Sequence, residues 1–142
     1  MVFKSRKDIF FKTVIIGTVT ILIGPPLYHY LDSGAAPDWP VYIINLAVIG
    51  FFLWFWLGTY YRLDATHIHY RSGPFRGKIA IDAISEVQRN TTMWSGFRPA
   101  TARKGIIVKY NKYDEIYFSP ATNETFIQAL LDVKGDILVN DK

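Results

Sequence analysis

Residues 39–61 of this 142-residue chain read WPVYIINLAVIGFFLWFWLGTYY and carry no formal charge. A transmembrane helix needs about 20 apolar residues to cross a hydrocarbon layer of about 30 Å. Tryptophan and tyrosine gather near both ends of this stretch, and both residue types favour the headgroup regions of a bilayer. The stretch therefore predicts a transmembrane helix over residues 39–61.

A second uncharged stretch lies upstream, over residues 13–31, and predicts another transmembrane helix. Pro25, Pro26 and His29 fall in its last third, and a proline pair removes helix hydrogen bonds or ends a helix. We therefore expect a kink or an early exit near Gly24. A signal peptide cleaved around residues 33–35 is the alternative, but a second span follows at once. The pattern favours a helical hairpin with a short extracytoplasmic turn over residues 32–38.

The charges that flank the two spans predict their orientation. Residues 1–12 form a basic N-terminus and further basic residues follow the second span, whereas the turn holds only Asp32 and Asp38. By the positive-inside rule, both termini are expected in the cytoplasm. The spans contain no acid–base pair, which disfavours a transport pathway, and Asn45 is expected to hydrogen-bond within the hairpin or to face a partner.

Beyond the second span the pattern changes to short alternating segments, which is typical of β-strands. Ser119 and Pro120 then resemble a helix N-cap and first turn, and Lys134 with Gly135 resembles a helix stop. Residues 111–114 predict a tight turn, and residues 136–142 an edge strand or a frayed end. Residues 62–142 are thus predicted to form an α+β domain, mainly antiparallel β, with a C-terminal helix. The six predicted strands cover residues 59–63, 66–71, 77–82, 84–89, 104–110 and 115–119.

Three segments carry a resemblance to a known family: IHYRSGPFRGKIAIDAISEV at residues 68–87, PATARKGIIVKY at 99–110 and EIYFSPATNETFIQAL at 115–130. With the two spans before them, they resemble small bacterial membrane proteins that carry a C-terminal bacterial pleckstrin-homology (PH)-like domain. The resemblance implies a small barrel of two nearly orthogonal antiparallel sheets, capped by the C-terminal helix. It also implies a multi-pass protein of the bacterial inner membrane. The complete fold has seven strands, so either residues 90–103 hide one or the barrel is incomplete.

The longest aperiodic segment, RNTTMWSGFRPATARK at residues 89–104, mixes aromatic and basic side chains. Such a mixture is typical of contact with a protein partner or with anionic lipid headgroups. The alternative is that its aromatic residues fold back onto the domain or dip passively into the membrane. The candidate contact residues are Arg89, Met93, Trp94, Phe97, Arg98, Arg103 and Lys104.

No motif in the sequence predicts catalysis, a cofactor or a metal. The chain has no cysteine, which excludes disulfides and thiolate chemistry. His67 and His69 share a predicted strand face but lack a third ligand, and Asp114 with Glu115 lies at a turn. Residues 62–142 carry 12 basic and 9 acidic side chains, an excess too small to predict nucleic-acid binding.

The sequence therefore predicts a non-enzymatic, membrane-anchored interaction or scaffolding module. Its expected partners are the lipid bilayer and a protein or a second copy of the chain, with no small-molecule substrate. The alternatives are a sensor of anionic lipid headgroups and an accessory subunit of a membrane enzyme or transport complex.

Overall fold

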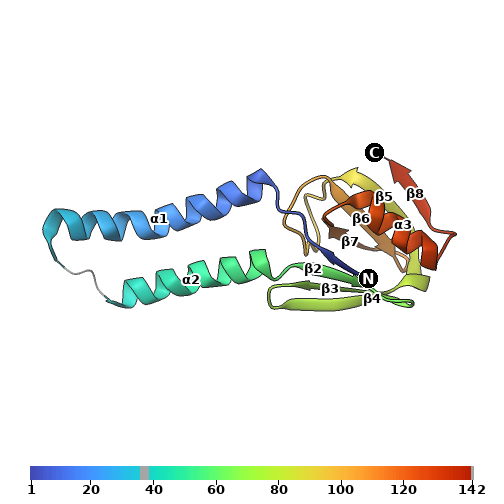
Figure 1. The fold of residues 1–142 in the computed structure, drawn as a ribbon, viewed down its shortest axis with the longest axis horizontal. Coiled ribbons are helices and arrows are strands. Elements are labelled where there is room, and N and C mark those ends of the chain that lie inside the picture. Colours follow the sequence, from blue (N-terminus) through green and yellow to red (C-terminus); the bar gives the residue numbers. More distant parts are fainter. Residues whose placement is uncertain (36–38, 142) are drawn as a thin grey trace.

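The computed structural model describes residues 1–35 and 39–141, which form a helical hairpin and a β-rich domain (Figure 1). Helix α1 runs over Ile9–Ser33 and helix α2 over Trp39–Leu57. Both differ from the predicted spans of residues 13–31 and 39–61. Helix α1 begins earlier because Asp8 caps it, and α2 ends earlier because the chain becomes a strand at Tyr60. Residues 36–38 of the predicted turn lie outside the described residues.

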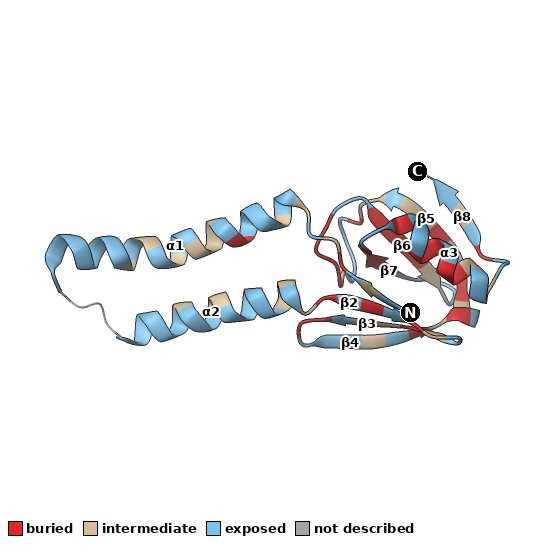
Figure 2. Cartoon of the chain, viewed as in Figure 1, coloured by how far each residue is buried: buried red, intermediate tan, exposed pale blue. Residues whose placement is uncertain are grey.

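The two helices expose apolar side chains around their whole circumference (Figure 2). No residue of α2, all of which is described, is buried, and α1 buries only Ile15. By length and composition alone, both helices are able to cross a membrane. A helix that is apolar all round requires an apolar environment on every side.

Helix α1 continues for two turns beyond Gly24, so the predicted early exit was wrong. Pro26 has no N–H group, which leaves the Leu22 carbonyl without its usual helical donor. The Nδ2 of Asn45 on α2 donates a hydrogen bond of 2.7 Å to that carbonyl. The expected hydrogen bond of Asn45 within the hairpin is thereby confirmed, and it satisfies a group that a proline has freed.

Replacing Asn45 by Leu is expected to loosen the hairpin. The change removes the donor to Leu22, and one such interhelical bond contributes about 1 kcal/mol in a membrane environment. Reversible unfolding of the full chain in detergent measures the loss. Thr20→Val is the matched control, because the Thr20 hydroxyl bonds within its own helix, to Ile16. Equal losses in the two variants would contradict the assigned role of Asn45.

The domain consists of two four-stranded sheets and one covering helix, α3, over Asn123–Val133. The first sheet has the order β1 (Val2–Lys4), β2 (Tyr60–Leu63), β3 (His67–Ser72), β4 (Phe75–Ala80). The second has the order β7 (Asp114–Phe118), β6 (Gly105–Tyr110), β5 (Ile84–Thr91), β8 (Leu138–Asp141). A short 3-10 helix, η1 (Ile81–Ala83), joins β4 to β5, and β8 lies parallel to β5 as an edge strand.

The strand missing from the sequence prediction comes from the N-terminus. Residues 90–103 were its expected place, but residues 92–104, all described, form no strand. Instead β1 pairs antiparallel with β2, with Phe3 opposite Tyr61. The segment predicted only as a basic N-terminus, residues 1–12, thus contributes a strand to the domain. The helical hairpin is inserted between two neighbouring strands of one sheet.

The two sheets and α3 enclose one core, and one corner between the sheets is joined by backbone contacts. The core centres on the aromatic rings of Tyr61, Phe118 and Phe126. At the corner, Ser5 forms a bridge with Pro120. Because Pro120 belongs to the contact between the two sheets at this corner, α3 begins at Asn123, after the N-cap Thr122. The predicted helix start at Ser119 was therefore wrong. The predicted architecture of mainly antiparallel sheets with a C-terminal helix is confirmed, and within the described residues the two sheets do not close, which is the incomplete barrel that the prediction left open.

Candidate contact surface beside the helical hairpin

Residues 92–104, called here the basic loop, lie between β5 and β6 at the helix-proximal end of the domain, where α1 begins and α2 ends (Figure 1). Four buried hydroxyl groups hold this loop, and we call them the hydroxyl cluster. They belong to Ser5, Tyr61, Thr101 and Ser119. The Ser5 Oγ lies 2.9 Å from the Thr101 Oγ1 and 2.8 Å from the Ser119 Oγ.

Tyr61 is the centre of the hydroxyl cluster. Its Oη donates a hydrogen bond of 2.7 Å to the carbonyl of Pro99 in the basic loop. It accepts one of 3.1 Å from the Ser119 backbone N–H. Burial raises the pKa of Tyr61, against the opposing effect of these hydrogen bonds, so the phenol stays neutral. The second half of the basic loop is thereby fixed to β2 and to the end of β7.

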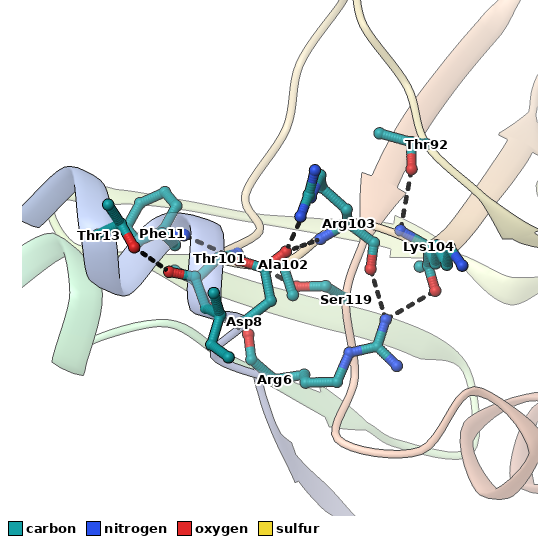
Figure 3. A network of polar contacts seen from close by, with 12 residues as sticks. Arg6, Asp8, Phe11, Thr13, Thr92, Thr101, Ala102, Arg103, Lys104 and Ser119 are labelled. Carbon is teal, nitrogen blue, oxygen red and sulfur yellow. Dashed lines mark hydrogen bonds and ion pairs between the residues drawn. The ribbon is translucent and has the colours of Figure 1, made fainter.

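The start of α1 holds the same loop from the other side (Figure 3). Asp8 accepts hydrogen bonds from the Arg103 backbone N–H at 2.9 Å and from its Nε at 3.3 Å. The other carboxylate oxygen of Asp8 caps α1 by accepting from the Phe11 N–H at 2.9 Å. Arg6 donates to the carbonyls of Arg103 and Lys104. One short segment, residues 5–8, therefore links β1, α1 and the basic loop.

The attachment at Asp8 is expected to depend on pH. Burial raises the pKa of Asp8, but hydrogen bonds from Phe11 and Arg103 and the charge of Arg103 outweigh it and hold the pKa below 3.8. A carboxyl group with a lowered folded-state pKa stabilises the fold above its unfolded pKa, and this contribution is lost as the pH falls through the folded value. The protection factor of the Arg103 amide, which corrects its exchange rate for the intrinsic pH dependence of amide exchange, should therefore fall below about pH 4.

The variant Asp8→Asn tests this expectation, because asparagine also caps helices but cannot titrate. Its Arg103 amide should have a lower protection factor than that of the natural chain at neutral pH, with no further fall on acidification. A natural chain whose Arg103 protection factor does not fall with acid would contradict the role of the Asp8 charge.

The structure does not bring the seven predicted contact residues together. Arg89 forms an ion pair with Asp141 on β8. Met93 is buried against Ala100, Ile107 and Tyr117. The Phe97 ring packs on Tyr70 and Phe75, and the Arg98 guanidinium lies over the Tyr117 ring, 5.6 Å from its centroid.

The remaining three, Trp94, Arg103 and Lys104, share a hollow of about 480 Å³, called here the Trp94 hollow. Its other lining residues are Arg6, Asp8 and Thr92. The Trp94 side chain is 81% exposed, although the residue before it is buried. Sequence reasoning missed Arg6, which was counted only as a charge that orients the spans, and Asp8, which was given no role. Asp8 directly before an apolar run is an N-cap signal that predicts a helix start at Ile9.

The two histidines on β3 do not join a larger set of metal-binding groups. His69 Nε2 lies 3.0 Å from Asp64, and His67 Nδ1 lies 2.8 Å from the Thr66 hydroxyl. Within residues 1–35 and 39–141, no three His, Cys, Asp or Glu side chains are grouped as a metal would require.

Comparison with known proteins gives two matches. The family model of the bacterial PH domain matches residues 59–134, more than half of the chain, starting just before β2. The uncharacterised protein YyaB of Bacillus subtilis (strain 168) is 22% identical over 144 residues, which cover 100% of this chain and 99% of that protein. No solved structure matches the chain. The similarity to YyaB therefore also includes the hairpin and β1, which the family model leaves out.

Proposed function

Because the chain belongs to the bacterial PH domain family, we propose that it is a membrane-anchored, non-catalytic module that binds a protein partner beside the membrane. The observation that carries the proposal is the exposed Trp94 on a loop that is fixed from both sides. The helical hairpin supplies the anchor, and the Trp94 hollow supplies the contact.

The hairpin supports membrane anchoring by its length and exposure. At about 1.5 Å per residue, the 19 residues of α2 extend close to the thickness of a hydrocarbon layer. Because β1 and β2 are paired, both ends of the hairpin lie on one side of such a layer. The basic residues at those ends favour the cytoplasmic side. We therefore propose an inner-membrane location with both termini in the cytoplasm.

The Trp94 hollow supports a protein partner more than a lipid headgroup. Arg103 is paired with Asp8, and Arg6 donates to two backbone carbonyls, so neither arginine is left without a partner. The hollow thus presents a large aromatic ring beside two arginines that are already neutralised or hydrogen-bonded, and Lys104 adds a third cation to its lining. Exposed tryptophan next to satisfied polar groups is typical of residues that dominate the binding energy of protein interfaces.

The absence of catalysis is also a proposal, and Glu86 itself has no character of a general acid or base. Hydrogen bonds from Gln88, Asn140 and Lys109 lower the pKa of Glu86 to about 2. This carboxylate links β5 to β6 and β8 and has the character of a structural ion pair, whereas a general acid or base would need a pKa near neutral pH.

The test is a pull-down of the full-length tagged chain from its native membranes in mild detergent. A stoichiometric protein partner is expected, and Trp94→Ala should reduce its recovery at least tenfold, about the effect of losing one dominant interface residue. Tyr113→Ala is the matched control, because Tyr113 is 84% exposed at the β6–β7 turn, outside the Trp94 hollow. A partner that is itself an enzyme or transporter would make the chain an accessory subunit. Equal recovery with the Trp94 and Tyr113 variants would contradict the proposed contact.

A further inference from the structure

A row of cations crosses the outer face of the first sheet. Lys4 lies opposite Tyr60, Tyr60 opposite Arg71, and Arg71 opposite Arg76, so one residue from each of the four strands is aligned. Directly opposed strand residues point to the same face, and all four side chains are exposed. We call this set the proximal row. The neighbours Tyr61 and Ser72 are buried on the opposite face.

A second row continues the cationic surface. Two residues farther along the strands, Arg62 lies opposite His69 and His69 opposite Lys78. The two rows line a hollow of about 520 Å³, to which Lys78, Arg62 and three members of the proximal row contribute. The outer face of β2, β3 and β4 is therefore concave as well as basic.

The cations of the proximal row have no acidic partner. Among the described residues, 1–35 and 39–141, no carboxylate lies within 4.0 Å of a charged nitrogen of Lys4, Arg71 or Arg76. Asp64, the acidic residue of this face, pairs with Arg62 at 3.1 Å and with His69 at 3.0 Å. This contrasts with the Trp94 hollow, where Asp8 neutralises Arg103. Unneutralised guanidinium groups next to one another favour a bound anion.

The proximal row lies directly beyond the end of α2. Tyr60 follows the last helical residue, Leu57, by three positions. The β3–β4 turn packs on the same helix, since a Cβ on Gly73 would lie 3.1 Å from the Phe55 Cα. If α2 fills the hydrocarbon layer, the next about 5–7 Å of the bilayer are its headgroups. The arginine and lysine side chains of the proximal row therefore reach the headgroups.

We propose that the proximal row binds the phosphate groups of acidic phospholipids in the leaflet where α2 ends. This inference rests on the proposed membrane anchoring. The hairpin holds the row beside the headgroups permanently, so even a weak site is occupied, because tethering gives a high effective concentration. The contact gathers acidic lipid around the hairpin and holds the first sheet against the bilayer surface. The basic loop remains available to a protein.

The test uses the full chain, reconstituted into bilayers that contain trace amounts of spin-labelled phosphatidylglycerol or phosphatidylcholine. Electron spin resonance measures the motionally restricted fraction of each labelled lipid. The test variant is Arg71→Gln/Arg76→Gln. The control, Lys112→Gln, removes one charge from the exposed turn after β6 and is compared with the single variants Arg71→Gln and Arg76→Gln.

The natural chain is expected to restrict phosphatidylglycerol more than phosphatidylcholine. The preference should fall by up to about fivefold for each arginine removed, should weaken with added salt and should persist in the lysine control. Three outcomes would overturn the proposal: an unchanged preference in the arginine variant, an equal loss in the lysine control, or competition by free inorganic phosphate beyond that of chloride at the same ionic strength. The last would indicate a site for a soluble anion.

Failure of this inference is distinguishable from failure of the proposed function. If neither labelled lipid is restricted, the hairpin is not in contact with the bilayer and the membrane anchoring fails. If both lipids are restricted equally, the anchoring holds and the headgroup site alone fails. A pull-down with the arginine variant tests the proposed contact at the Trp94 hollow independently, through its recovery of a protein partner.

Discussion

A chain that begins at Thr59 is expected not to fold, although it contains every residue that the family model matches. Such a chain lacks β1, which exposes the backbone edge of β2. It also loses the Phe3 ring, whose centroid lies 5.1 Å from that of Phe126 in the core. Truncation of a fully buried phenylalanine costs about 3–5 kcal/mol, of which the half-buried Phe3 contributes a part, and most domains are stable by only about 5–15 kcal/mol. Removal of the strand, the ring and the Ser5 hydroxyl together is therefore predicted to abolish cooperative unfolding.

The matched control restores β1 without the helices. In it, residues 1–7 are joined to residue 58 by a flexible Gly/Ser linker, which is feasible because Lys4 and Tyr60 are paired neighbours. This joined chain should show near-UV circular dichroism and a cooperative thermal transition, whereas the chain from Thr59 should show neither. If both chains unfold cooperatively at the same temperature, β1 is dispensable and the domain boundary belongs at residue 59.

The same strand marks the limit of what local sequence patterns predict. The alternation of apolar and polar residues predicted strands after the hairpin such as β2, which has one buried and one exposed face. Strand β1 has only three residues and pairs across the whole hairpin, so no local periodicity reveals it. The resemblance to the family left two alternatives, a strand in residues 90–103 or an incomplete barrel, and neither pointed to the N-terminus.

Two further errors have the same cause, since in each a distant partner decides the structure. Ser119 and Pro120 have the local pattern of a helix start, but the Ser119 hydroxyl bonds Ser5, which lies at the other end of the chain. Pro25 and Pro26 have the pattern of a helix end, but Asn45 on α2 supplies the missing donor. Local signals for caps and breaks hold only where no long-range hydrogen bond competes with them.

The candidate site was predictable as a segment but not residue by residue. Aromatic and basic content indicated residues 89–104, and Trp94 is indeed exposed. Sequence spacing in an aperiodic loop cannot show that Met93, next to it, is buried, because no repeating face defines inside and outside. Nor can it show that Asp8 neutralises Arg103, since the two are far apart in the chain.

Tyr61→Phe is expected to destabilise the domain by about 2–4 kcal/mol, an unusually large effect for the loss of one oxygen atom. The Tyr61 hydroxyl is fully buried and bonds both the Pro99 carbonyl and the Ser119 N–H. Without it, these two backbone groups are left unsatisfied, and each costs about 1–3 kcal/mol when buried. Thermal unfolding of the full chain in detergent measures the loss of stability.

The part of the domain in which amide exchange accelerates distinguishes this prediction from general destabilisation. Because Pro99 and Thr101 lie in the basic loop, amide exchange in residues 97–103 should accelerate more than in β3, which receives no hydrogen bond from the Tyr61 hydroxyl. Tyr60→Phe is the control, since the Tyr60 ring is 38% exposed and removal of its hydroxyl breaks no buried hydrogen bond. If the two variants unfold at the same temperature, the hydroxyl cluster does not hold the loop. If Tyr61→Phe frees the loop, recovery of the proposed protein partner is expected to fall with it, because the proposed contact requires Trp94 on a fixed loop.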